Sequence, residues 1–172
     1  MGLWMIHSAD EGDAAEIAAI YNHYVLNTAV SFEEEAVSEE EMRARIRGKI
    51  GSYPWIVLES VGPGREILGY AYAGPWKERA AYRHTLEDTI YVKAGETGRG
   101  IGRKLLKELL EELAKGTEVH ALMAVIALPN EASVRLHEEF GFEKAAHFTE
   151  VGRKFGTWID VGYWELIPGR RG

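Results

Sequence analysis

The sequence predicts an α+β fold in which a central mixed, mostly antiparallel sheet is flanked by helices. Segments rich in β-branched and aromatic residues alternate with segments whose apolar residues recur at helical spacing, in the order β-α-α-β-β-β-α-β-α-β-β. A turn at residues 61–64 joins two strand-like segments and predicts an antiparallel hairpin. The apolar run at 120–128 follows a helix long enough to return the chain in parallel beside the preceding strand, so a mixed sheet is expected.

In the first half of the chain, two capping signals indicate where helices begin. Asp10 precedes the first helix, which has acidic residues in its first turn, and Ser38 stands three residues before Glu41 in a capping-box pattern. The loop at 27–35 contains Phe32, which is expected to pack in the core or to form a pocket wall. The predicted elements of this half are a strand at 3–7, helices to about 26 and from 38 to 50, and strands at 53–59 and 66–73.

In the second half, glycines and a proline separate the elements. Residues 89–92 suit a strand, and four glycines follow it within eight positions: Gly95, Gly98, Gly100 and Gly102. A helix then carries leucines at helical spacing to Leu113. The remaining predicted elements are a strand at 120–128, a helix from 129 that ends before Gly141, and strands at 142–151 and 157–167.

Composition excludes several classes of protein. The 172 residues predict a single domain, 1–172, and the net charge of −7 leaves no broad basic face for nucleic acid. The chain has no cysteine, which excludes disulfides, zinc-thiolate sites and a cysteine nucleophile, and no metal site is expected. No signal peptide or membrane-spanning segment is recognisable, so a cytoplasmic protein without a membrane partner is expected.

The glycine-rich turn at 95–102 leads into a helix and predicts an anion site. A helix that starts from such a turn offers unpaired backbone N–H groups and a positive dipole end, which suit phosphate. The spacing fails for a P-loop, because Ile101 and Gly102 stand where Lys and Ser or Thr belong, and for a dinucleotide fingerprint, because Leu105 replaces the third glycine. Cations gather beside the turn: Arg99, Arg103, Lys104 and Lys107. The alternative is a plain glycine turn next to a solvated helix face.

Glu87 is the candidate general base. It enters the strand that leads to the glycine turn, on the strand face that it shares with Thr89 and Tyr91. An amine must lose a proton before it attacks a thioester, and a carboxylate at this place is suited to accept that proton. A purely structural or exposed Glu is the alternative.

The helix after residue 129 carries polar residues at i, i+3 and i+7 on one face: Asn130, Ser133 and His137. The core side of this helix is expected to hold three other residues: Ala132, Leu136 and Phe140. Asn130 is suited to an amide-rich arm such as pantetheine, and His137 is suited to protonate a leaving thiolate or to relay a proton. An inert histidine is the alternative.

The turn at 97–102 resembles the acetyl-coenzyme A pyrophosphate loop of the GNAT acetyltransferase superfamily, [QR]-x-x-G-x-[GA], although Thr97 departs from the pattern at its first position. Over about residues 4–166 the chain more closely resembles the phosphinothricin and methionine sulfoximine N-acetyltransferases of that superfamily. The matching segments are IYNHYV (20–25), AGPWKERAAYRH (73–84), AYRHTLEDTIYV (81–92), AVIALPNEASVRLHEEFGF (124–142) and VGRKFGTWIDVGYWEL (151–166). This resemblance implies the GNAT fold, acetyl-CoA as donor, a small amino acid acceptor and a homodimer.

The resemblance also implies roles for individual residues. Glu87 would be the catalytic base, with His137 assisting near the thioester. The residues implied to hold acetyl-CoA are Tyr91, Val92, Arg99, Gly100, Ile101, Gly102, Arg103, Asn130 and Ser133. The residues implied on the acceptor side are Phe32, Lys77 and Arg79, together with Lys154, which would reach a neighbouring subunit. Lys77 stands where relatives often place Arg, and Lys lacks bidentate carboxylate recognition.

The predicted function is therefore transfer of acetyl from acetyl-CoA to the α-amine of an amino acid analogue such as phosphinothricin or methionine sulfoximine. Two alternatives stay open. One is a GNAT enzyme that acts on a polyamine, an aminoglycoside or a protein N-terminus, for which acidic residues such as 33–35 would suit the acceptor. The other is a coenzyme-A-binding sensor without turnover.

Overall fold

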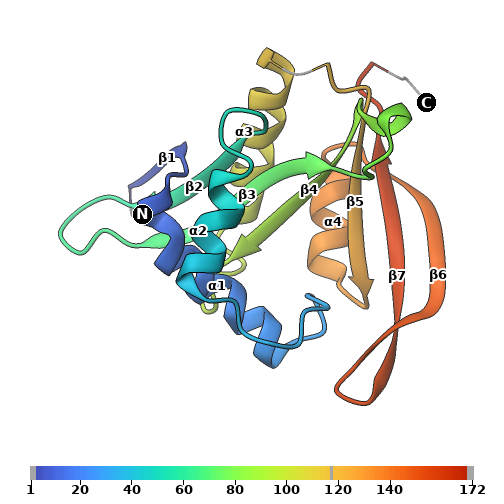
Figure 1. The fold of residues 1–172 in the computed structure, drawn as a ribbon, viewed down its shortest axis with the longest axis horizontal. Helices are drawn as coiled ribbons and strands as arrows, with labels where there is room; N and C mark the ends of the chain where they lie inside the picture. Colours follow the sequence, from blue (N-terminus) through green and yellow to red (C-terminus); the bar gives the residue numbers. More distant parts are fainter. Residues whose placement is uncertain (1–2, 117, 170–172) are drawn as a thin grey trace. The chain divides into compact units, whose positions relative to one another are not determined.

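The computed structural model describes residues 3–116 and 118–169 (Figure 1). The chain divides into two compact units. Unit 1 comprises Met1–His23, Ala36–Ala73 and Thr89–Thr117, and unit 2 comprises Tyr24–Glu35, Gly74–Asp88 and Glu118–Gly172. One strand, β4 (Thr85–Val92), contributes its first half to unit 2 and its second half to unit 1.

Unit 1 contains the strands β1, β2, β3 and the end of β4, hydrogen bonded in that order. Its elements are β1 (Trp4–Ser8), η1 (Glu11–Asp13), α1 (Ala14–Asn27, whose last turn belongs to unit 2), α2 (Glu39–Arg47), β2 (Trp55–Ser60), β3 (Ile67–Pro75) and α3 (Ile101–Gly116). The pairs β1–β2 and β2–β3 are antiparallel. Helix α3 contacts β2 and buries its leucine stripe, which explains the helical spacing of those residues (Figure 1).

A glycine in β3 allows α3 to pack closely on the strand. A Cβ added at Gly69 would lie 3.0 Å from Leu105 Cδ1 and 3.1 Å from Ile101 Cγ2, both in α3. Because real Cβ contacts are rarely this short, a larger residue would push α3 away from the strand. Ile101, the first residue of α3, is thereby anchored in the core, and it fixes where the glycine turn ends.

Unit 2 contains the start of β4, then β5, β7 and β6 in hydrogen-bonding order. Its other elements are η2 (Ala80–Tyr82), β5 (Ala121–Leu128), α4 (Glu131–Glu139), β6 (Glu143–Lys154) and β7 (Thr157–Leu166). The start of β4 pairs with β5 in parallel, whereas β5–β7 and β6–β7 are antiparallel. Figure 1 shows β6 and β7 as a long hairpin, with α4 next to β5.

The predicted fold class and element order are confirmed, including the antiparallel hairpin at β2–β3 and the parallel pair at β4–β5. Both predicted caps are present, since Asp10 accepts from Gly12 N (2.7 Å) and Ser38 Oγ accepts from Glu41 N (3.1 Å). The predicted extension of α2 to residue 50 is wrong, because Gly48 caps the helix after Arg47. Strand β4 begins at Thr85, two residues before Glu87, where the chain is predicted to enter the strand, because its first residues pair with β5.

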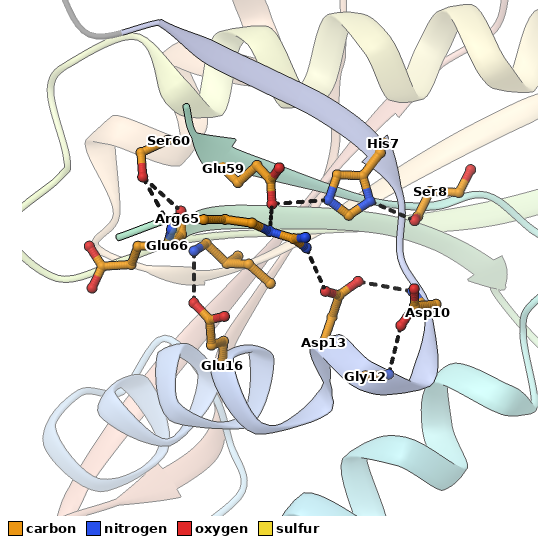
Figure 2. A network of polar contacts seen from close by, with 11 residues as sticks. His7, Ser8, Asp10, Gly12, Asp13, Glu16, Glu59, Ser60, Arg65 and Glu66 are labelled. Atoms are coloured by element: carbon orange, nitrogen blue, oxygen red, sulfur yellow. Dashed lines mark hydrogen bonds and ion pairs between the residues drawn. The ribbon is translucent and has the colours of Figure 1, made fainter. Parts of the chain in front are cut away.

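A polar network in unit 1 ties the β2–β3 hairpin to β1 and to η1 (Figure 2). Glu59 is buried at the end of β2, lies 3.3 Å from His7 Nε2 and forms an ion pair with Arg65. Arg65 also lies 3.5 Å from Asp13 Oδ1, and the other oxygen of Asp13 accepts from Asp10 N (3.0 Å). A buried carboxylate needs such partners, so the network stabilises this end of unit 1.

Within residues 3–116 and 118–169, none of the helices has the length and apolar character that crossing a membrane requires.

Candidate active site

The glycine turn in unit 1 has the backbone geometry of an anion site. Gly95, Gly98 and Gly100 have φ values of +86°, +76° and +83°, in the left-handed region that favours glycine. The carbonyl of Gly100 accepts from Lys104 N (3.1 Å), so Gly100 stands immediately before the first turn of α3. That first turn contains no acidic residue, and its N–H groups and dipole therefore suit a phosphate.

The cations beside the turn are partly engaged with neighbours. Arg99 pairs with Glu96, and Lys107 pairs with Glu111. Lys104 Nζ lies 5.6 Å from the centre of the Trp4 ring. The backbone geometry of the turn is therefore stronger evidence for an anion site than the number of cations.

Strand β4 carries three of the predicted site residues. Glu87 is half-buried in the part of β4 that belongs to unit 2, and its Cα pairs with Met123 of β5. Tyr91 and Val92 are half-buried in the part that belongs to unit 1, where the Tyr91 ring packs edge-on against Tyr21 at 5.2 Å. A half-buried carboxylate keeps part of its surface accessible, which a general base requires.

Asn130 and Ser133 form the start of α4. The side-chain oxygen of Asn130 accepts from Ser133 N (3.2 Å), which makes Asn130 the N-cap of the helix. The cap fixes the orientation of the Asn130 amide, whose nitrogen is a hydrogen-bond donor. Asn130 and Ser133 therefore lie together at the start of the helix.

His137 lies in a different environment from the one that the sequence predicts. It is the buried residue of α4, with 5% exposure, whereas Ala132 is exposed and Leu136 and Phe140 are half-buried. The prediction that those three form the core side is therefore wrong. The reason is that the His137 ring packs edge-on against Phe142 at 5.0 Å and meets a buried partner on β4.

That partner is Asp88, a residue that the sequence reasoning missed. Asp88 Oδ2 lies 3.0 Å from His137 Nε2, and Ser133 O lies 2.7 Å from His137 Nδ1. Burial lowers the pKa of His137, but the hydrogen bond and charge of Asp88, with the Ser133 carbonyl, outweigh it and raise this pKa above its ordinary value. The alternation of side chains along β4 could have revealed Asp88. Because neighbours on a strand point to opposite faces, the carboxylate of Asp88 lies on the face opposite to Glu87, towards α4.

The same alternation separates His137 from Glu87. Neighbouring side chains on a strand point to opposite faces, and Asp88, next to Glu87, contacts His137. His137 therefore lies on the face of β4 opposite to Glu87. The role predicted for His137, to protonate a leaving thiolate or to relay a proton, stays a prediction.

Lys154 is also placed differently from its prediction. Its side chain is buried with 2% exposure and donates to Val25 O and Ser31 O of the same chain, both at 2.6 Å. Burial lowers the pKa of Lys154, against the opposing charges of Glu34 and Glu33. The prediction that it reaches a neighbouring subunit is therefore corrected: two carbonyls of its own subunit hold the ammonium group.

Phe32 is held by the same part of unit 2. Its ring packs on the backbone of Gly152, where an added Cβ would lie only 2.2 Å from Phe32 Cε2, and Lys154 binds the preceding carbonyl of Ser31. Phe32 remains 44% exposed, as a pocket wall would be. Strand β6 thus fixes an exposed aromatic ring on the 24–35 segment.

Lys77 and Arg79 lie in the exposed segment after β3. Lys77 Nζ is 5.2 Å from the centre of the Trp76 ring, which itself packs edge-on against Tyr82 at 5.2 Å. Arg79 precedes η2 and is exposed. An aromatic pair therefore shapes the segment that carries both cations.

Comparisons with known proteins agree with these features. The family model described as an acetyltransferase (GNAT) domain matches residues 6–162. The chain is 40% identical to a phosphinothricin N-acetyltransferase from Streptomyces coelicolor over 90% of this chain and 91% of that protein. It is 38% identical to an L-methionine sulfoximine/L-methionine sulfone acetyltransferase from Salmonella typhimurium, over 94% of this chain and 92% of that protein.

Solved structures give the same result. A putative acetyltransferase from Salmonella typhimurium with its cofactor acetyl-CoA superposes with a TM-score of 0.91 at 36% identity, covering 98% of this chain and 95% of that chain. A phosphinothricin acetyltransferase from Sinorhizobium meliloti in complex with acetyl-CoA has a TM-score of 0.88 at 34% identity, covering 95% of this chain and 88% of that chain. With a family model that spans most of its length, the chain belongs to the GNAT acetyltransferases.

Proposed function

We propose that the protein transfers an acetyl group from acetyl-CoA to the α-amine of a small amino acid analogue such as phosphinothricin or methionine sulfoximine. The observation that carries the proposal is the position of Glu87, a half-buried carboxylate inside the strand that continues to the glycine turn. Relatives that are 38–40% identical over at least 90% of this chain bear the names of these acetyltransferases.

In the proposed reaction Glu87 accepts a proton from the acceptor amine, directly or through a water molecule. The amine nitrogen then forms a bond to the acetyl carbon, the carbon–sulfur bond breaks, and coenzyme A leaves as a thiolate. The second proton, which the nitrogen loses on becoming an amide, passes to that thiolate through solvent. Backbone N–H groups at the end of β4, around Tyr91 and Val92, would stabilise the oxyanion. No covalent enzyme intermediate is required, which suits a chain without cysteine.

The coenzyme would be held by backbone groups more than by side chains. The turn from Arg99 to Arg103 would bind the pyrophosphate at the start of α3, and Asn130, with Ser133, would meet the pantetheine arm. On the acceptor side, Phe32 would form a wall of the pocket, and Lys77 or Arg79 would attract the acceptor carboxylate. Lys154 would act within its own subunit, by holding the carbonyl next to Phe32.

The experiment is an assay of free thiol release from acetyl-CoA with a panel of acceptors. The panel contains methionine sulfoximine, phosphinothricin, ordinary amino acids and polyamines. Turnover with the first two supports the proposal. Turnover with polyamines alone would favour the alternative acceptor class, and coenzyme binding without turnover on the whole panel would indicate a sensor.

A homodimer is part of the same proposal. In unit 2, β6 is the last strand in the hydrogen-bonding order, and most of its residues are exposed. Four large apolar side chains gather on the β6–β7 hairpin with 48–64% exposure: Phe148, Val151, Phe155 and Trp158. An apolar cluster on an open edge strand suits a protein interface.

The single-domain organisation and the cytoplasmic location stay predictions.

Val151→Glu is expected to convert the dimer into a monomer, because it places a charge in the apolar cluster of the hairpin. The matched control is Val61→Glu in the β2–β3 turn, where the wild-type valine is 53% exposed against 58% for Val151. Light scattering after size exclusion measures the mass of each variant. A wild-type protein with the mass of one chain, or equal effects of both variants, would contradict the proposed interface.

A further inference from the structure

We propose that Asp88 is a positioning residue, which keeps His137 as a fixed imidazolium and thereby locks α4 onto the strand that carries Glu87. The inference rests on the proposed function, because it takes Glu87 as the base and the start of α4 as the coenzyme contact. It assigns His137 a structural charge in place of proton transfer.

The hydrogen bonds of the ring determine its protonation. His137 Nδ1 lies 2.7 Å from the carbonyl of Ser133, which can only accept, so Nδ1 carries a hydrogen. His137 Nε2 lies 3.0 Å from Asp88 Oδ2, and an ionised carboxylate also only accepts. Both ring nitrogens therefore carry hydrogens, and each hydrogen is already donated to a protein group.

Among the described residues, Asp88 is the charged side chain that pairs with the His137 ring. The side chains of Asp88 and His137 are 1% and 6% exposed. Strand β5, which contacts α4, reads ALMAVIAL and contributes only apolar side chains, and Phe142 covers the ring edge-on. The neighbouring carboxylate of Glu138 accepts instead from Trp164 Nε1 on β7 (3.0 Å).

The contacts form a continuous path from the base to the coenzyme side of unit 2. Glu87 and Asp88 are neighbours in β4, Asp88 binds His137, His137 binds the carbonyl of Ser133, and Ser133 N donates to the cap residue Asn130. Moving Asp88 therefore moves either the strand that carries Glu87 or the helix that begins at Asn130.

Stability alone does not explain this pair. Asp88 Oδ1 is buried and has no hydrogen-bond partner. Such an oxygen carries a desolvation penalty, and well-packed apolar residues often replace a buried ion pair without loss of stability. The pair gives instead a defined orientation of α4 on β4, which a reaction needs when its base and its coenzyme contact lie on different elements.

The decisive experiment compares Asp88→Asn, His137→Gln and the double variant. Each single change is expected to lower kcat about tenfold to hundredfold, as small misplacements of reacting groups do. The double variant can form a neutral Asn–Gln hydrogen bond and is expected to recover most of the activity. If the double variant is as inactive as His137→Gln while melting like the wild type, His137 transfers protons and the proposal is wrong.

The matched control is Asp160→Asn. Asp160 Oδ2 lies 2.7 Å from His147 Nε2, and this imidazole–carboxylate pair is more exposed than the pair of His137 and Asp88. The change should leave kcat unchanged. A second readout needs no turnover, so failure of the proposed function remains distinguishable. In ¹⁵N NMR, both ring nitrogens of His137 should keep the imidazolium signature to a higher pH in the wild type than in Asp88→Asn. Loss of the signature at the same pH in both proteins would overturn the proposal.

Discussion

Glu87→Gln is expected to lower kcat for acetyl transfer by about 10²- to 10⁴-fold, the range that a positioned general base contributes. Glutamine keeps the size and hydrogen-bonding capacity of the side chain but cannot accept the amine proton at neutral pH. Since Glu87 is assigned to proton transfer and not to coenzyme contact, the dissociation constant for acetyl-CoA should stay close to the wild-type value. An assay of thiol release measures kcat, and calorimetric titration measures the dissociation constant for acetyl-CoA.

The matched control for this change is Glu131→Gln on α4, an exposed Glu that pairs with Arg135 on the surface. It should alter neither quantity. An unchanged kcat, or a loss that is explained entirely by weaker acetyl-CoA binding, would show that Glu87 is not the base.

Gly100→Asp should raise the dissociation constant for acetyl-CoA about 100-fold or more, since juxtaposed like charges cost several kcal/mol. Gly100 has φ +83°, an added Cβ there would meet nothing within 4 Å, and aspartate tolerates this left-handed conformation better than most residues. The change would therefore add a negative charge to the proposed pyrophosphate turn without unfolding it. Titration of the purified variant with acetyl-CoA gives the constant.

Two controls separate charge from backbone strain. Gly100→Asn has the same shape and the same φ requirement without the charge, so only a few-fold loss is expected. Gly64→Asp places the same residue at φ +84° in open space in a different turn, the one between β2 and β3, and should leave coenzyme binding unchanged. Equal losses for Gly100→Asp and Gly100→Asn would mean that the turn does not hold a phosphate.

Much of the fold follows from local patterns. The leucines of α3 at helical spacing, the Ser38 cap of α2 and the glycine turn all predict their elements, because each signal lies within a few neighbouring residues. Boundaries that depend on distant partners were less predictable. Strand β4 begins at Thr85 because it pairs with β5, and nothing near Thr85 in the sequence records that pairing.

In the candidate site, too, local patterns could be predicted from the sequence, whereas contacts between distant residues could not. Spacing alone places Asn130, Ser133 and His137 on one helical face, but it does not tell how deep each lies. The burial of His137 goes with its contact to Asp88, far away in the sequence, and the proposed positioning role follows from that contact. The family resemblance predicts a reaching side chain for Lys154, whereas the carbonyls of Val25 and Ser31 hold it inside its own subunit.

Acetyl transfer to an amino acid is tested most directly by the identity of the product. Purified protein is incubated with acetyl-CoA labelled with ¹³C in its acetyl group and with methionine sulfoximine or phosphinothricin, and the products are analysed by mass spectrometry and NMR. The expected result is ¹³C-acetyl on the α-nitrogen of the acceptor, in an amount equal to the thiol released. Thiol release with unmodified amino acids, or label found only on other amines, would contradict the proposed function.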